Sequence, residues 1–273
     1  MLEILKTILI GIVQGITEWL PVSSTGHMIL LDELIKLNVS DAFMELFRVV
    51  IQLGSILAVL VLYFKKLNPF ALSKSAKEKK DTWTLWFKVV VAVLPSAVIG
   101  LLLDDWFDAH FYNYITVAIT LVVYGVVFLF LDRMGAGKNL ADRTQDITFR
   151  TAFLIGCFQV LAIIPGTSRS GSTIIGAMLF GLTRAAAAEF SFFMAIPTML
   201  GASGLKAVKF LLDGYAMTGM EIAVLLTGCA VAFIVSLVSI RALMNYVRRH
   251  SFKAFGAYRI VLGVIVMMWY LLH

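Results

Sequence analysis

The chain alternates long apolar stretches with short polar segments. An α-helix needs about 20 predominantly apolar residues to cross a bilayer. Six stretches approach or reach that length, at about residues 46–64, 85–103, 113–131, 190–212, 221–240 and 257–272. Two further apolar regions, about 4–37 and 149–184, are interrupted in the middle. This pattern predicts an all-α polytopic membrane protein with about six transmembrane helices.

Each interrupted region has a polar centre rich in serine, glycine and proline. The first centre runs from Pro21 to His27 (PVSSTGH), and the second runs from Pro165 to Gly171 (PGTSRSG). The residue before a proline is biased away from helical geometry, so each region splits into two short helical pieces. Such pieces are too short to span the membrane. We therefore predict two re-entrant helical hairpins.

Composition and charge agree with a membrane protein. Of the 273 residues, 60% are hydrophobic and only 15% are charged, whereas soluble domains carry about 25% charged residues. The net charge of +6 does not indicate a nucleic-acid partner, because the basic residues lie in short loops between apolar stretches. Cys157 and Cys229 lie inside apolar segments, which indicates packing rather than a disulfide or a metal site.

The loop charges predict an orientation. Basic residues gather at 65–80, 132–150 and 241–253, whereas the segment with Asp104, Asp105 and Asp108 and the segment 213–220 have none. Cytoplasmic loops of membrane proteins carry an excess of Lys and Arg. The three basic loops are therefore expected in the cytoplasm, and both termini are expected outside.

The two halves of the chain resemble each other weakly. Gln14 and Gln159, Ser24 and Ser168, Phe47 and Phe190, and Leu53 and Ile196 recur at offsets of 143 to 145. We interpret residues 1–273 as one membrane domain built of two repeats, 1–140 and 141–273, each with one hairpin and three spans. Because three is odd, the second repeat is inverted, and both hairpin tips reach the bilayer midplane. Chance matches in an apolar chain are the alternative.

Ionisable side chains inside apolar segments cost roughly 2.5 kcal/mol or more each, so they are candidate functional residues. Glu18, His27 and Arg169 are of this kind. Gln14 lies four residues before Glu18, on the same face of the first short helix. A nucleophile, an acid or base and a carboxylate therefore fall within ten residues, together with the hydroxyl groups of Ser23, Ser24 and Thr25.

The second interruption has the features of an anion site. Its polar groups at a helix start are Gly166, Ser168, Arg169, Ser170 and Thr173. Backbone N–H groups at a helix N-terminus attract anions, and a guanidinium binds phosphate oxygens bidentately. If the two hairpin tips meet, the carboxylate and hydroxyls of one half face this cradle. Such an arrangement predicts phosphoryl transfer.

These motifs also carry a family resemblance. The runs QGITE (14–18), PVSSTGH (21–27), VIQLGS (50–55) and PGTSRS (165–170) resemble the undecaprenyl pyrophosphate phosphatase family, also called the bacitracin resistance proteins. The resemblance implies hydrolysis of undecaprenyl pyrophosphate to undecaprenyl phosphate and inorganic phosphate, which recycles the lipid carrier for peptidoglycan and the cell wall. It also implies a divalent cation (Mg²⁺ or Ca²⁺), a site open to the outer face of the bacterial plasma membrane, and a homodimer.

With this resemblance, we expect Glu18, Ser24, His27 and Arg169 to be catalytic and Glu18 to hold the metal. Substrate binding is assigned to Gln14, Ser23, Thr25, Gly166, Ser168, Ser170 and Thr173. The family has Glu or Gln at the position of Gln14, and a Gln cannot act as a base.

The sequence leaves the nucleophile and one rival function open. Ser24, activated by Glu18 or His27, would form a phosphoseryl intermediate, whereas His27 itself, or water with Glu18 as base, are alternatives. A transporter or flippase for phosphate or a phosphorylated lipid is the rival function, since inverted repeats with broken helices are usual in carriers. A carrier, however, has no use for a hydroxyl, an imidazole and a carboxylate that converge on the anion.

Overall fold

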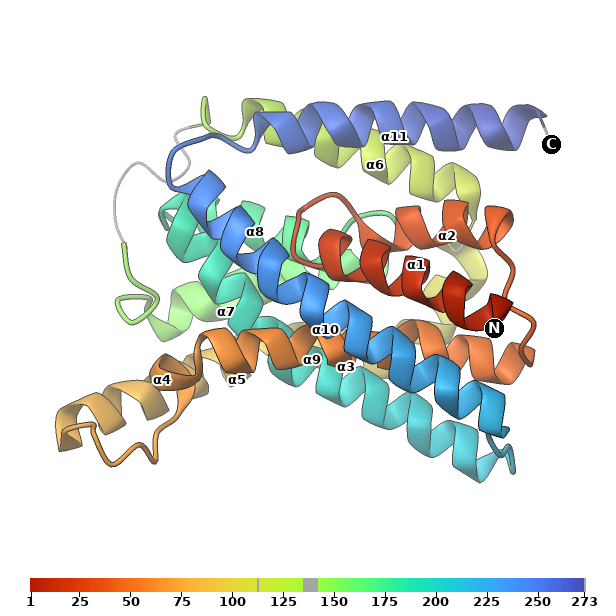
Figure 1. Cartoon of the computed structure of the whole chain (residues 1–273). Helices are drawn as coiled ribbons and strands as arrows, with labels where there is room; N and C mark the ends of the chain where they lie inside the picture. The colour runs from red at the N-terminus through yellow and green to blue at the C-terminus, as the bar shows by residue number, and fades with distance from the viewer. Residues whose placement is uncertain (112, 135–141, 273) are drawn as a thin grey trace.

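A computed structural model describes residues 1–111, 113–134 and 142–272, and their regular elements are helices (Figure 1). In chain order they are α1 (Leu2–Thr17), α2 (Ser24–Leu34), α3 (Asp41–Leu62), α4 (Phe64–Leu67), α5 (Ala76–Phe111), α6 (Tyr114–Phe130), α7 (Phe149–Val160), the 3₁₀ turn η1 (Leu161–Ile163), α8 (Arg169–Leu179), α9 (Arg184–Leu212), α10 (Gly219–Val247) and α11 (Lys253–Leu272). The predicted all-α class is confirmed.

Six of these helices match the six predicted apolar spans. Among the described residues, α3, α9, α10, α11 and the part of α5 up to Leu103 are long and apolar enough to cross a membrane. The sixth, α6, is a shorter apolar helix of 17 residues. Since about 20 apolar residues span a bilayer, the chain is a multi-pass membrane protein.

Two predicted loops are shorter in the structure. Helix α5 continues to Phe111, so residues 104–111 are helical rather than a loop, and α10 continues to Val247, which leaves only 248–252 outside a helix. Neither stretch contains a proline or a glycine, so nothing in the backbone forces the helix to stop where the apolar pattern ends. Lys138 and the side chains of Asp104, Asp105 and Asp108 lie outside the described residues.

Both predicted interruptions are present, and each ends in the same unusual way. Ser23 precedes α2 with φ 72°, and Ser168 precedes α8 with φ 73°. Each serine accepts a hydrogen bond from the backbone N–H three residues on, at 3.3 Å from Gly26 and 3.1 Å from Gly171. Ser23 and Ser168 thus have the same capping role at an offset of 145 residues, whereas the sequence comparison pairs Ser24 with Ser168. A positive φ is rare for serine and persists only where the surroundings fix it.

Several helices of the first half of the chain pack against helices of the second half. Helix α1 lies along α10 and α7 lies along α5, while α6 and α11 lie side by side (Figure 1). Glycines permit the closest approaches. A Cβ on Gly54 of α3 would lie 2.2 Å from the Cys229 carbonyl oxygen of α10, and a Cβ on Gly156 of α7 would lie 2.0 Å from the Ala92 carbonyl oxygen of α5. Small residues at helix crossings are typical of membrane bundles.

This packing brings the two interruptions into contact. The Ser170 hydroxyl, at the start of α8, donates to the backbone carbonyl oxygens of Glu18 and Leu20 at 3.3 and 3.4 Å. The segment that links α1 to α2 therefore contacts the start of α8, although about 150 residues separate the two in the chain. We call residues 18–24 the first turn and residues 164–169 the second turn, so that each turn includes the first residue of the helix that follows it.

Candidate active site at the junction of the two turns

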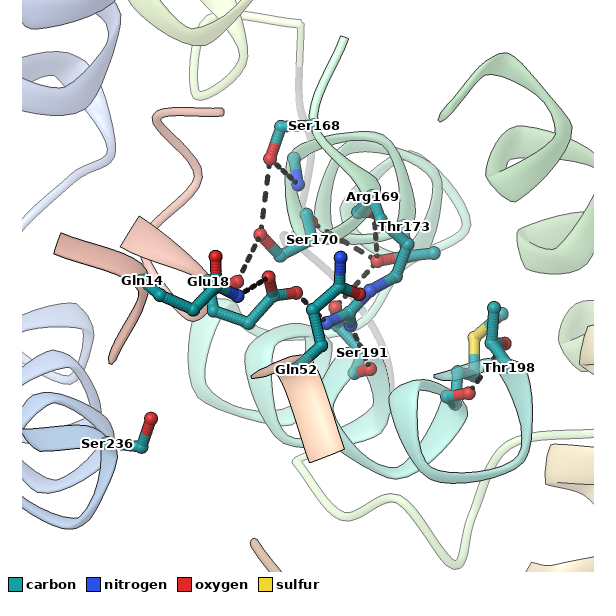
Figure 2. A network of polar contacts seen from close by, with 12 residues as sticks. Gln14, Glu18, Gln52, Ser168, Arg169, Ser170, Thr173, Ser191, Thr198 and Ser236 are labelled. Atoms are coloured by element: carbon teal, nitrogen blue, oxygen red, sulfur yellow. Dashed lines mark hydrogen bonds and ion pairs between the residues drawn. The ribbon is translucent and has the colours of Figure 1, made fainter. Parts of the chain in front are cut away.

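A buried ion pair joins the two turns. Glu18 lies at the C-terminal end of α1, and its Oε1 accepts a 2.8 Å hydrogen bond from Nη2 of Arg169, the first residue of α8 (Figure 2). The side chain of Glu18 is 5% exposed and that of Arg169 is 12% exposed. The other carboxylate oxygen, Oε2, accepts from Nε2 of Gln14 at 2.8 Å. Because Gln14 and Glu18 are four residues apart on α1, the helix itself sets this contact.

The Arg169 guanidinium is held on several sides. Its Nη1 donates to the Ser191 carbonyl oxygen of α9 at 3.0 Å, and its Cζ lies 5.8 Å from the ring centroid of the fully buried Trp19. Its Nε is buried and has no hydrogen-bond partner among the described residues. Among the described residues, one donor of the guanidinium therefore has no acceptor.

Three hydroxyl groups of the second half lie close to this pair (Figure 2). The Ser168 and Ser170 hydroxyls are 3.3 Å apart. Thr173 is fully buried, and its Oγ1 lies 2.6 Å from Ser191 Oγ. Ser168 and Ser170 are therefore next to the ion pair, whereas Thr173 supports α8 against α9 from behind.

Several predicted site residues lie at the start of α2, where the first turn ends. Ser24 and Thr25 are the first two residues of α2 and are partly exposed, whereas Ser23 is fully buried. The His27 ring contacts the Ser23 carbonyl oxygen through Nδ1 at 2.7 Å and the Tyr258 hydroxyl of α11 through Nε2 at 2.6 Å. The structure thus unites Gln14, Glu18 and Arg169 directly, and it places His27 against α11.

Gly166, assigned to the phosphate cradle from the sequence, lies close to α6. It is buried with φ 86°, and a Cβ there would lie 2.2 Å from the Thr120 hydroxyl of α6. Only a glycine fits this backbone geometry and this close approach. Gly166 thus lets the second turn pack closely against α6.

Sequence reasoning missed several residues of this region. Ser191 and Trp19 contact Arg169, and Tyr258 contacts His27. Arg259 of α11 is fully buried and bonds to both turns. The cost of an ionisable side chain in an apolar span, which singled out Glu18, would also have singled out Arg259. The carbonyl of Ser191 gave no sequence signal, because every residue has one.

A small pocket lies between α1, α2 and α3 and borders this site at Gln14. It has a volume of about 20 Å³ and is lined by Ile10, Gln14, Met28, Leu31, Met44, Phe47, Arg48 and Ile51. Six of these eight side chains are apolar. Gln14 belongs both to the pocket and to the hydrogen-bond network of Glu18.

The donors at the site are sparse for a metal. Within the described part of the chain, no group of three or more His, Cys, Asp or Glu side chains could hold an ion. Glu18 is the carboxylate of the network. Each carboxylate oxygen has about two lone-pair sites, so Glu18 can keep both hydrogen bonds and still bind a cation. Mg²⁺ is commonly held by one or two carboxylates together with substrate phosphates, and the site fits that minimal arrangement.

Comparison with known proteins assigns the family. The profile described as bacitracin resistance protein BacA matches residues 7–265. The chain belongs to this family. Three relatives, each named undecaprenyl-diphosphatase, are similar over nearly their whole length. The protein of Enterococcus faecalis is 55% identical over 269 residues, 97% of each chain. That of Desulfitobacterium hafniense is 56% identical over 99% of this chain and 97% of its own, and that of Acetivibrio thermocellus is 57% identical over 99% of both.

Membership of the BacA family confirms the resemblance that the sequence motifs carried. The matched region contains both turns, the ion pair between them, and Tyr258 and Arg259 of α11. The roles of the individual site residues stay predictions, which rest on the geometry above.

Proposed function

We propose that this protein is an integral membrane phosphatase that hydrolyses undecaprenyl pyrophosphate to undecaprenyl phosphate and inorganic phosphate. The observation that carries the proposal is the buried Glu18–Arg169 pair at the junction of two turns in an apolar bundle. Charged groups at membrane depth are costly and are usually functional. The relatives named undecaprenyl-diphosphatase supply the identity of the lipid.

Arg169 binds the diphosphate in this proposal. Its Nε donor has no partner among the residues that the structure describes, and a guanidinium matches phosphate oxygens better than an ammonium does. Ser168 and Ser170 add hydroxyl donors beside it. When the substrate binds, Arg169 shifts hydrogen bonds from Glu18 to the phosphate oxygens, and the Glu18 carboxylate becomes free to accept a proton.

Ser24 is the proposed nucleophile. Its Oγ attacks the terminal phosphorus, the bond from that phosphorus to the bridging oxygen breaks, and undecaprenyl phosphate leaves. The hydroxyl proton goes to Glu18, or to His27 Nε2 once that nitrogen gives up its hydrogen bond from Tyr258. Water then hydrolyses the phosphoseryl group, which releases inorganic phosphate and restores the serine. His27 is less suited as the nucleophile, because both of its ring nitrogens are engaged, with the Ser23 carbonyl and with Tyr258.

A divalent cation, Mg²⁺ or Ca²⁺, would be held by Glu18 and by the phosphate oxygens of the substrate. When bound, it would neutralise negative charge on the diphosphate.

The isoprenoid chain enters through the pocket between α1, α2 and α3. The pocket holds only about one water molecule at 20 Å³, so the chain must displace side chains. Met28 and Met44 line it, and methionine is unbranched and adaptable. The diphosphate then reaches Gln14 and the ion pair while the rest of the chain stays in lipid.

The two halves form an inverted repeat with re-entrant hairpins in this proposal. Support comes from the similar serine caps at Ser23 and Ser168. It also comes from the packing of the first helix of each half, α1 and α7, against a helix of the other half, α10 and α5. The units are residues 1–140 and 141–273. The loop charges favour termini outside and a site toward the outer face of the plasma membrane. A homodimer remains a proposal that follows from the family resemblance.

The test is phosphate release from undecaprenyl pyrophosphate by purified protein in detergent. Wild type should release phosphate, and Ser24→Ala should release none and trap no phosphoserine. Ser73→Ala is the matched control, because Ser73 is exposed in the segment between α4 and α5. If Ser24→Ala retains wild-type activity, Ser24 is not the nucleophile. If wild type releases no phosphate with Mg²⁺ or Ca²⁺, the enzyme proposal fails and a carrier becomes the leading function.

A further inference from the structure

Helix α11 carries a buried guanidinium that pairs with no carboxylate in the described part of the chain. Arg259 is fully buried. Its hydrogen bonds go to backbone carbonyl oxygens, and its Cζ lies 5.4 Å from the ring centroid of Tyr124 on α6. A buried cation without a counter-ion is costly. The backbone carbonyl oxygens that accept its hydrogen bonds indicate what Arg259 does in the structure.

The carbonyl partners of Arg259 come from both turns of the site. Nη1 donates to Pro21 in the first turn at 3.2 Å. Nη2 donates to Gly166 and Thr167 in the second turn at 2.9 and 3.1 Å, and to Thr120 at 3.4 Å. One rigid, planar group thus joins two segments that lie about 145 residues apart in the chain. A lysine ammonium is a single point of charge and cannot reproduce this fork.

The residue before Arg259 holds a predicted catalytic side chain. The Tyr258 hydroxyl lies 2.6 Å from His27 Nε2, and the two rings are stacked with an interplanar angle of 4°. His27 Nδ1 lies 2.7 Å from the Ser23 carbonyl oxygen, which can only accept, so Nδ1 carries the proton. In the neutral ring Nε2 is then the acceptor and Tyr258 the donor. Tyr258 therefore fixes both the tautomer and the orientation of His27.

We propose that Tyr258 and Arg259 of α11 are positioning residues for the phosphatase reaction. This proposal rests on the proposed function. Arg259 sets the distance between the turns that carry Ser24 and Arg169, and Tyr258 orients His27. Because Arg259 is fully enclosed and its two terminal nitrogens are occupied, it acts on the substrate only through the turns.

The test compares kcat and KM for phosphate release in wild type, Arg259→Lys and Tyr258→Phe. Arg259→Lys keeps the positive charge and removes the planar guanidinium. If only the charge of Arg259 mattered, this variant would therefore keep wild-type activity. We expect kcat to fall by about 10- to 100-fold, because a misplacement of about 1 Å can cost 100-fold in rate. KM should change less than kcat, since neither substitution removes a group that is assigned to bind the substrate. Tyr258→Phe keeps the stacked ring and removes only the hydroxyl, and it should lower kcat by about tenfold, as expected for one lost hydrogen bond.

Matched controls separate positioning from folding. Arg249→Lys and Tyr270→Phe make the same chemical changes at exposed positions, and they should leave both constants unchanged. Thermal denaturation and gel filtration check the fold of each variant. If Arg259→Lys does not fold, the kcat of Tyr258→Phe alone tests the proposal. The proposal is overturned if folded Arg259→Lys or Tyr258→Phe keeps wild-type kcat, or if KM alone rises. An inactive wild type would instead overturn the proposed function and this inference together.

Discussion

The contact between Arg169 and Glu18 predicts a large loss of activity from a change that keeps the charge. In Arg169→Lys, one ammonium replaces a guanidinium that bonds to Glu18 at 2.8 Å and to the Ser191 carbonyl at 3.0 Å. A lysine can keep one of these bonds, but it cannot keep both and also bind phosphate bidentately.

The magnitude follows from the lost hydrogen bonds. A hydrogen bond to a charged group contributes about 1.5–3 kcal/mol. A loss of about 2 to 3 kcal/mol in the transition state lowers kcat/KM by about 30- to 150-fold. The assay is phosphate release from undecaprenyl pyrophosphate in detergent, with Arg241→Lys, an exposed position on α10, as the matched control.

A double-mutant cycle tests whether the two residues act as a pair. Glu18→Gln leaves Arg169 buried beside a neutral amide, which removes the charge partner of the guanidinium. Because both changes disrupt one contact, the double variant Glu18→Gln/Arg169→Lys should lose less activity than the product of the single losses. Our reasoning is refuted if Arg169→Lys stays within about threefold of wild type, well under the loss of one charged hydrogen bond, or if the two losses multiply.

Three further predictions concern stability and the metal. Gly54→Ala should lower the thermal denaturation temperature, because its Cβ would lie 2.2 Å from the Cys229 carbonyl oxygen and overpacking costs about 1–3 kcal/mol; Gly201→Ala, which meets open space, is the control, and equal behaviour of the two would contradict the packing argument. Ser168→Gly should be more stable than Ser168→Ala, since both lose the cap but only glycine adopts φ 73° without strain; thermal denaturation measures this, and the reverse order would count against it. EDTA should abolish phosphate release without changing the denaturation temperature, and added Mg²⁺ should restore it, because Glu18 would hold the ion only together with substrate phosphates; activity that persists in EDTA would exclude an essential ion.

Which residues make up the membrane helices was determined by local properties of the sequence. Apolar length gives the spans, and proline with serine and glycine gives the two interruptions. The cost of charge in lipid singles out Glu18 and Arg169 without knowledge of any contact, and the structure places them 2.8 Å apart. The local pattern failed at helix ends: α5 continues past the apolar stretch to Phe111, because hydropathy does not stop a helix.

The tertiary structure alone decided which groups meet. Ser23 and Ser168 both have a positive φ, and serine as a residue type does not predict that conformation. Arg259 reaches both turns because α11 packs beside α6. That packing depends on close approaches between helices far apart in the chain. Sequence periodicity describes one helix at a time, whereas hydrogen bonds to the carbonyls of Pro21 and Gly166 depend on the relative placement of several helices.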